Sequence, residues 1–316
     1  MVGGLAFLVA LLGLIGTAIR DPYPHDLPVG LAGAPQAVQQ ISAAFASNAP
    51  GAFHFTTYGS EADAIAALDS RDIDAALILG STPRLVVAGA AGDGTTGVIT
   101  AAFTNVFKSQ GTTLDIQVVH PFFAGDAHGL VLFFVVVAVI IATVISQALL
   151  FTTTRGIGFG PRLAVVLAFA ILAGPVAMGT AQLIAGDYGS GFWAAVGLLV
   201  LAAAAVGATT AGLVALVGRT GFGLAALVIV LLDLVSSGGP VGSNLLPDFY
   251  RWLAPWLPAS PLYGGLRGAL YFDGAGVVGP IVILSGWLAA GIVMMLLGEF
   301  VSARRRRGAT ALETAH

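Results

Sequence analysis

Hydrophobic residues along this chain gather in long uninterrupted runs, which is the pattern of helices surrounded by lipid. A membrane-spanning helix needs about 20 consecutive apolar residues. Five runs reach about that length, at residues 2–19, 129–151, 163–185, 192–217 and 277–297. A shorter run at 222–235 leads directly into Ser-Ser-Gly-Gly-Pro, so we expect its end to break or to turn back within the membrane. The pattern predicts a membrane α-helical bundle of six transmembrane helices.

A polar stretch with alternating helix and strand signals separates the first two runs. Strands are predicted at 27–31, 53–58, 73–79, 85–88 and 114–119, and helices at 34–47 and 95–109. A further helix is predicted after Ser60, which opens a Ser-Glu-Ala-Asp capping pattern. We therefore expect an α/β domain over residues 21–127, between transmembrane helix 1 at 1–20 and a membrane domain at 128–300. A basic tail follows at 301–316.

Composition agrees with this division of the chain. Hydrophobic residues make up 57% and charged residues 9%, and the mean hydropathy is +0.93. Soluble domains carry about 25% charged residues, so an ordinary soluble protein is excluded. The net charge of −3 gives no reason to expect a nucleic-acid partner. The chain has no cysteine, which excludes disulfides and thiolate metal sites and suits a bacterial envelope protein.

Arginine placement predicts the orientation in the membrane. Arg155 and Arg162 lie between the second and third runs, Arg219 lies between the fourth and fifth, and residues 304–307 are four arginines after the last. Positively charged loops stay on the cytoplasmic side. We therefore expect a multi-pass protein of the bacterial plasma membrane, with both termini cytoplasmic and the α/β domain outside.

No arrangement of residues that carries enzyme chemistry is recognisable. His54 and His120 have no partner at metal-ligand spacing, and Asp69, Asp72 and Asp74 cluster at a turn, where aspartate is common. The chain has no phosphate-binding loop, no serine nucleophile elbow and no zinc-protease motif. We expect no catalytic residue, no metal and no cofactor, and the chain itself is not expected to hydrolyse ATP.

Small residues predict how one helix of the bundle packs. Ala203, Gly207 and Ala211 recur at four-residue spacing in the fourth run, and such a face lets helices approach closely in lipid. A less favoured interpretation is that these residues line a substrate path.

Asp233 is the most informative polar residue in the apolar runs. A charge inside hydrocarbon costs about 2.5–3.5 kcal/mol on insertion scales, and such residues are often functional. Two readings stay open: a residue at the mouth of a substrate path, with Arg267 as a partner, or a cap at headgroup depth. Trp252 and Trp256 belong to an aromatic-rich segment that is typical of an interfacial belt and would alternatively gate a substrate.

Two stretches carry a resemblance to a known family. Residues 61–79 read as a helix, a polar turn and an alanine-rich strand, and residues 253–267 are rich in proline and aromatic residues ahead of the last run. With one span, a large polar domain and five further spans, the chain resembles the ABC type-2 exporter permeases. The similarity is to their branch with a large outer domain, which includes the phage-infection-protein-like membrane proteins.

The resemblance implies a permease subunit of an exporter for an amphiphilic or envelope-related substrate. It implies a homodimer or a heterodimer with a paralogue, a separate ABC ATPase subunit, and an outer re-entrant segment at 238–272. It also assigns Arg155, Phe159 and Arg162 to a cytoplasmic coupling loop. That loop has three glycines, a proline and no acid, which makes a poor helix. The alternative is therefore an ATPase-independent envelope protein whose anchored outer domain binds a partner or supports secretion.

Overall fold

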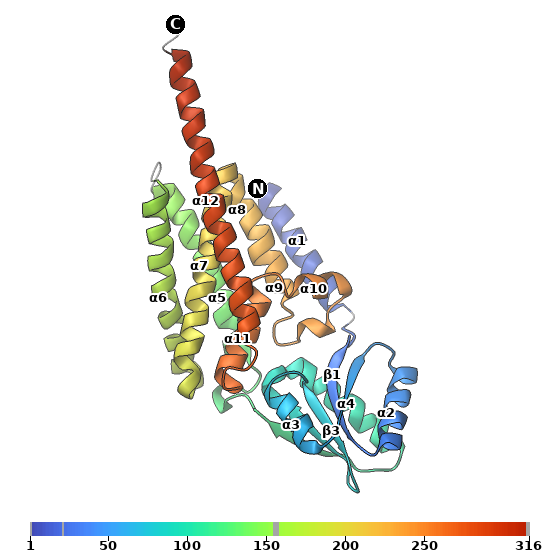
Figure 1. The fold of residues 1–316 in the computed structure, drawn as a ribbon. Helices are drawn as coiled ribbons and strands as arrows, with labels where there is room; N and C mark the ends of the chain where they lie inside the picture. The colour runs from blue at the N-terminus through green and yellow to red at the C-terminus, as the bar shows by residue number, and fades with distance from the viewer. Residues whose placement is uncertain (1, 21, 154–157, 314–316) are drawn as a thin grey trace.

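A helical bundle with a small α/β domain at one end makes up the protein (Figure 1). The computed structural model describes residues 2–20, 22–153 and 158–313. Helix α12 projects beyond the bundle at the end opposite the α/β domain, and α1 begins near that same end. The α/β domain and the two chain ends therefore lie at opposite ends of the bundle.

Long apolar helices form the bundle, as the hydrophobic runs predict. The helices that form most of it are α1 (Val2–Ile19), α5 (Leu130–Thr153), α6 (Phe159–Ala185), α7 (Phe192–Val217) and α12 (Val278–Glu313). Among the described residues, four stretches are long and apolar enough to cross a membrane: Leu130–Phe151, Phe159–Ala185, Gly189–Val217 and Val278–Val301. Two apolar helices are shorter, Leu8–Ala18 and Thr220–Ser236. The length and composition of the four long stretches identify a helical membrane protein.

Helix α7 is the centre of the bundle, and small residues let its neighbours approach closely. Ala203 and Ala211 are buried, and a Cβ added at Gly207 would lie 3.0 Å from Val166 of α6. A Cβ added at Gly291 of α12 would overlap the backbone of α7 at Thr209. Close approach of this kind replaces hydrophobic burial as the source of helix association in lipid.

The fifth hydrophobic run forms a broken helix. It consists of α8 (Thr220–Ala225), a π-helix (Ala226–Leu232) and the short α9 (Asp233–Ser236). The chain then turns at Gly238 and Gly239, where φ is 68° and 50°, values that glycine tolerates without strain. The expected break after residue 235 is present, whereas the π-helix has no signal in the apolar pattern.

A short series of helices follows this turn and returns the chain to the bundle. It contains a 3-10 helix (Ser243–Leu245), α10 (Asp248–Leu253) and α11 (Ala259–Tyr271). Leu262, Leu266 and Leu270 are buried, so the apolar face of α11 packs on the bundle, mainly against α7 and α12. We call residues 237–276 the return segment.

The α/β domain contains one mixed five-stranded sheet, and each predicted strand is confirmed within a few residues. The strands are β1 (Leu27–Gly33), β2 (Phe53–Tyr58), β3 (Ala75–Leu79), β4 (Arg84–Ala88) and β5 (Asp115–Val119), in the order β2-β1-β3-β4-β5. Only the β3–β4 pair is antiparallel. Helices α2 (Pro35–Asn48), α3 (Glu61–Asp69) and α4 (Asp93–Ser109) connect the strands.

Helices cover both faces of this sheet. Phe45 of α2 and Phe103 of α4 pack on one face, together with Leu31 of β1 and Leu77 of β3. Helix α3 packs on the other face, and its hydrophobic core continues into the core of the bundle. The α/β domain and the bundle therefore share a packed contact, and that contact brings together the polar residues described next.

Candidate functional site at the junction of the two parts

Asp233 connects the broken fifth helix to the return segment. Its side chain is fully buried, and both carboxylate oxygens accept the backbone N–H of Ala259, at 2.9 and 3.0 Å. Ala259 is the first residue of α11, so Asp233 satisfies one of the unpaired N–H groups of that helix end. The geometry is that of a helix cap supplied by another helix.

The expected pairing of Asp233 with Arg267 is wrong. Arg267 lies two turns further along α11, and its guanidinium reaches the α/β domain instead. It donates to the carbonyl oxygens of Ala90, at 3.4 Å, and of Ala91, with its Cζ atom 4.7 Å from the centre of the Tyr263 ring. Asp233, from α9, binds the first residue of α11, and Arg267 lies two turns further along, so α11 is anchored near both ends.

Arg71 makes the reverse contact, from the α/β domain to the return segment. It follows α3 and donates to the carbonyl oxygens of Gly264, at 2.8 Å, and of Ala275, at 3.4 Å. Arg267 and Arg71 thus each cross the junction and bind main-chain carbonyls on the other side. Hydrogen bonds from a charged donor contribute about 1.5–3 kcal/mol each, so these contacts fasten the two parts strongly.

Phe272 occupies the space between two side chains of the α/β domain. Arg71 lies over its ring at 5.0 Å, and the His120 ring lies 4.7 Å away. His120 is held in turn by Asp69, whose carboxylate is 2.8 Å from its Nε2 atom. The buried Phe272 ring of the return segment therefore packs between side chains that come from the turn after α3 and from the end of β5.

Burial and charge at the junction perturb two titratable groups. Burial, together with the nearby Arg267, lowers the pKa of Arg71 to about 10, and Asp74 opposes the shift. Burial raises the pKa of Asp74 to about 6, against the influence of Arg267 and Arg71. The junction therefore places one carboxyl among two arginines in a partly desolvated setting, where electrostatic interactions are stronger than in water.

Backbone strain is concentrated at the same place. In the described chain, the non-glycine residues with positive φ are Asp26, Arg71, His120 and Asp273, at 51°, 66°, 45° and 49°. Each belongs to the junction: Arg71 and His120 hold Phe272, Asp273 follows it, and Asp26 pairs with Arg251 of α10 at 3.2 Å. Such conformations cluster at clamps and switch regions, where the surrounding structure holds them in place.

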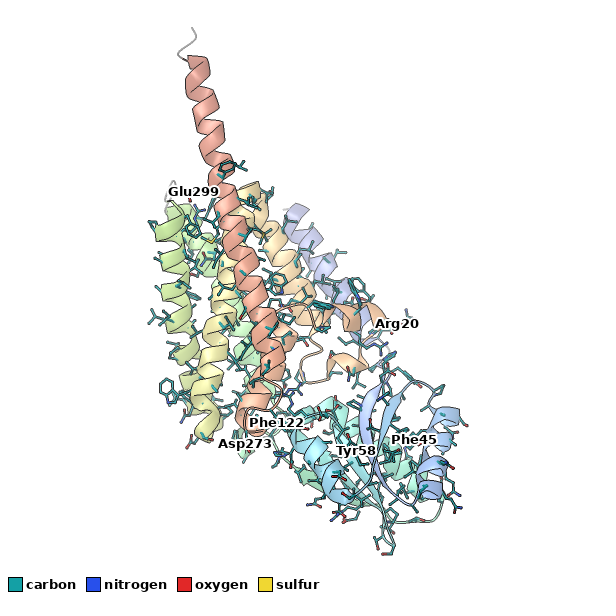
Figure 2. All side chains as sticks on the ribbon, in the orientation of Figure 1. Arg20, Phe45, Tyr58, Phe122, Asp273 and Glu299 are labelled. Atoms are coloured by element: carbon teal, nitrogen blue, oxygen red, sulfur yellow. The ribbon has the colours of Figure 1, made fainter. Side chains whose placement is uncertain are left out.

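The start of α4 completes the junction. Gly94 donates its N–H to the carbonyl oxygen of Pro240, at 3.1 Å, and a Cβ at Gly94 would overlap the carbonyl of Val241. Figure 2 shows Phe122 and Asp273 where the bundle meets the α/β domain, with Glu299 at the other end of the bundle. The return segment thus contacts the α/β domain along most of its length.

The segment of residues 249–272 has seven aromatic residues, and the expected interfacial belt is wrong for four of them. Four of these residues are buried within the protein. Tyr250 packs against α1 and donates its hydroxyl to the carbonyl oxygen of Leu14, at 3.0 Å, whereas Tyr263, Tyr271 and Phe272 belong to the core around α11. Trp252 and Trp256 are 68% and 60% exposed, whereas the Asp233 side chain is fully buried. The carbonyl oxygen of Trp256 accepts a hydrogen bond from Nε1 of Trp287, at 2.7 Å.

Of the predicted coupling-loop residues, Phe159 and Arg162 lie at the far end of the bundle from the junction. Arg155 lies outside the described residues. Phe159 begins α6 and donates its N–H to the Glu299 carboxylate, at 3.3 Å, and Arg162 lines a small cavity between helices. Glu299 of α12 therefore contacts the start of α6.

Comparison of the chain with protein-family models, with curated proteins and with solved structures finds no match. The site is therefore interpreted from its own geometry.

Proposed function

We propose that this protein is the membrane permease subunit of an ABC-type exporter, with a separate ATPase subunit and an amphiphilic or envelope-related substrate. The observation that carries the proposal is the double anchoring of α11. One end is capped by Asp233 of the broken helix, and the other is held to the α/β domain by Arg267. Movement of the α/β domain would then be passed to a helix inside the bundle.

The broken fifth helix is the part of the bundle that such a movement would rearrange. Its π-helix precedes Asp233 directly, and π-helical turns occur frequently at functional sites because their looser geometry permits local rearrangement. In the proposed topology this helix and α1 are the fifth and first of six spans. Both termini would be cytoplasmic, and the α/β domain would lie outside.

An amphiphilic substrate suits the outer surface of the bundle. A groove of about 740 Å³ runs between α5 and α6, and its walls are apolar, with Leu130, Phe134, Leu172, Val176 and Ile184 among them. Leu130 and Ile184 bring the groove to the end of the bundle that carries the α/β domain. In the proposed assembly two copies, or one copy and a paralogue, enclose the path.

Co-purification in mild detergent tests the proposal. A nucleotide-binding subunit should be retained with the wild-type protein, and export of a fluorescent amphiphile from cells should depend on both subunits. The topology is tested with single cysteines at Gln40 and in the tail at Ala309, because the chain has no cysteine of its own. An impermeant reagent should label only Gln40→Cys in intact cells.

A second candidate is the ATPase-independent envelope protein whose α/β domain binds a partner. Strand β5 favours it, because β5 is at the edge of the sheet and Ile116 and Val118 are 39% and 54% exposed. An open edge with apolar side chains is a site where another chain adds a strand. If the protein is an envelope protein that binds a partner, lysine at both positions should abolish capture of that partner. If the protein is an exporter permease, the same variant should leave ATP-dependent export unchanged.

A further inference from the structure

A small cavity lies between helices at the end of the bundle opposite the junction. Gln147 and Phe151 of α5, Arg162 of α6, Val214 of α7 and Phe222 of α8 are among its walls. The enclosed space is about 10 Å³, which is close to the volume that one water-sized group occupies. The cavity can therefore hold a single oxygen atom of a larger group that remains at its mouth.

The polar atoms available to such a group are hydrogen-bond donors. Gln147 is 3% exposed, and its Nε2 atom has no hydrogen-bond partner among the described residues. Within the same part of the chain, no ion pair or hydrogen bond is made by the half-buried guanidinium of Arg162. A buried donor without a partner costs about 1–3 kcal/mol. An anionic oxygen in the cavity would satisfy both side chains.

Packing around the cavity is arranged so that Gln147 keeps its place. Gly207 packs beside Gln147, since a Cβ added there would lie 3.6 Å from Nε2, at van der Waals distance, and Ala211 of the same small-residue face lines the cavity. The rings of Phe151 and Phe222 meet edge to face at 5.5 Å. These apolar walls lower the local dielectric and strengthen a charged hydrogen bond.

We propose that this cavity binds a phosphate oxygen of an anionic phospholipid headgroup. The cavity lies where α5 ends, α6 begins and α7 meets α8, which is headgroup depth for helices of this length. Basic pockets between transmembrane helices are known binding sites for anionic lipid headgroups. Exposed apolar side chains on the adjoining turns, Ile145 of α5 and Val165 of α6, offer a surface for the acyl chains.

Lipid binding by the purified full-length protein tests the inference without any ATPase partner, so its outcome is independent of the proposed exporter function. In neutral detergent, phosphatidylglycerol should raise the melting temperature and remain bound in native mass spectrometry. Phosphatidylcholine has the same phosphate, but its quaternary ammonium offsets the negative charge beside Arg162, so it should bind at least tenfold more weakly. Arg162→Gln should weaken phosphatidylglycerol binding at least tenfold. Arg219→Gln, at an exposed arginine of the same bundle end, should leave it within twofold.

Gln147→Glu is the sharper variant, because it replaces the donor amide with an acceptor that repels an anion. It should abolish the shift in melting temperature, and Arg162→Gln keeps the test valid if Gln147→Glu does not fold. Equal losses in Arg162→Gln and Arg219→Gln would overturn the site, since the binding would then follow overall charge. A full response to inorganic phosphate alone would overturn the assignment to a lipid.

Discussion

Replacing Arg267 with methionine should detach the α/β domain from α11 while leaving both parts folded. Methionine keeps most of the aliphatic packing and removes the charged group. The lost contacts are the hydrogen bond to Ala91, a longer one to Ala90 at 3.4 Å, and the interaction with the Tyr263 ring. One good charged hydrogen bond contributes about 1.5–3 kcal/mol, and a cation–π contact contributes about 0.5–2 kcal/mol.

Relief of the repulsion between Arg267 and Arg71 offsets part of this loss. We therefore expect the contact to weaken by about 2–4 kcal/mol, which is about 30- to 1,000-fold in the equilibrium between attached and detached states. Hydrogen exchange of the full-length protein in detergent measures it. Peptides covering 89–94 and 264–275 should lose protection, and peptides from β1 and β3 should not.

Arg84→Met is the matched control, because Arg84 is an arginine of the same domain that pairs with Glu61 on the surface. Surface pairs contribute about 0–1 kcal/mol, so this variant should exchange like the wild type. Unchanged protection of both junction peptides in Arg267→Met would refute the reasoning. So would an equal loss of protection across the whole α/β domain, because that result would mean unfolding and not detachment.

Three other predictions concern the same region. Asp233→Leu should lower the free energy of unfolding by about 1–3 kcal/mol in thermal or denaturant unfolding, because it leaves the buried N–H of Ala259 without an acceptor. Asp233→Asn should cost clearly less, since asparagine also caps helices. Equal losses in the two variants would contradict the capping role. The pKa of Asp74 is raised from 3.8 to about 6 in the folded protein, so the folded state binds this proton more tightly than the unfolded state does. The stability that protonated Asp74 contributes is therefore present below pH ~4 and is lost as the pH rises to about 6. Asp74→Asn should remove that slope from melts recorded between pH 4 and 8, and matching pH profiles would disprove the assignment. Gly94→Ala should destabilise the junction, because the added Cβ would overlap Val241. Gly97→Ala is the control in the same helix; its Cβ would enter open space and should stabilise the protein by about 0.5–1 kcal/mol. Similar melting temperatures for the two variants would count against the close approach.

Local sequence signals predict the long apolar helices of the bundle and the strands of the α/β domain, but not the π-helix. Apolar runs of about 20 residues are helices in lipid because every backbone group must be paired within its own segment. The strands of the α/β domain are marked by short apolar stretches between turn residues, and Ser60 caps α3 through the N–H of Asp63 as its pattern predicts. The break after residue 235 follows from glycine and proline, whose backbone preferences are intrinsic.

The partners of the polar residues were decided only by the tertiary structure. Arg71 and the carbonyl it binds at Gly264 are 193 positions apart, and no periodicity relates them. The sequence offers Arg267 only as a candidate partner of Asp233, because spacing cannot show that α11 turns one end toward the broken helix and the other toward the α/β domain. In the sequence, His120 is an ordinary residue at the end of a strand, and Asp74 is an ordinary aspartate of a turn. Their roles arise from desolvation and from contacts between distant segments, and both exist only after the two parts have packed together.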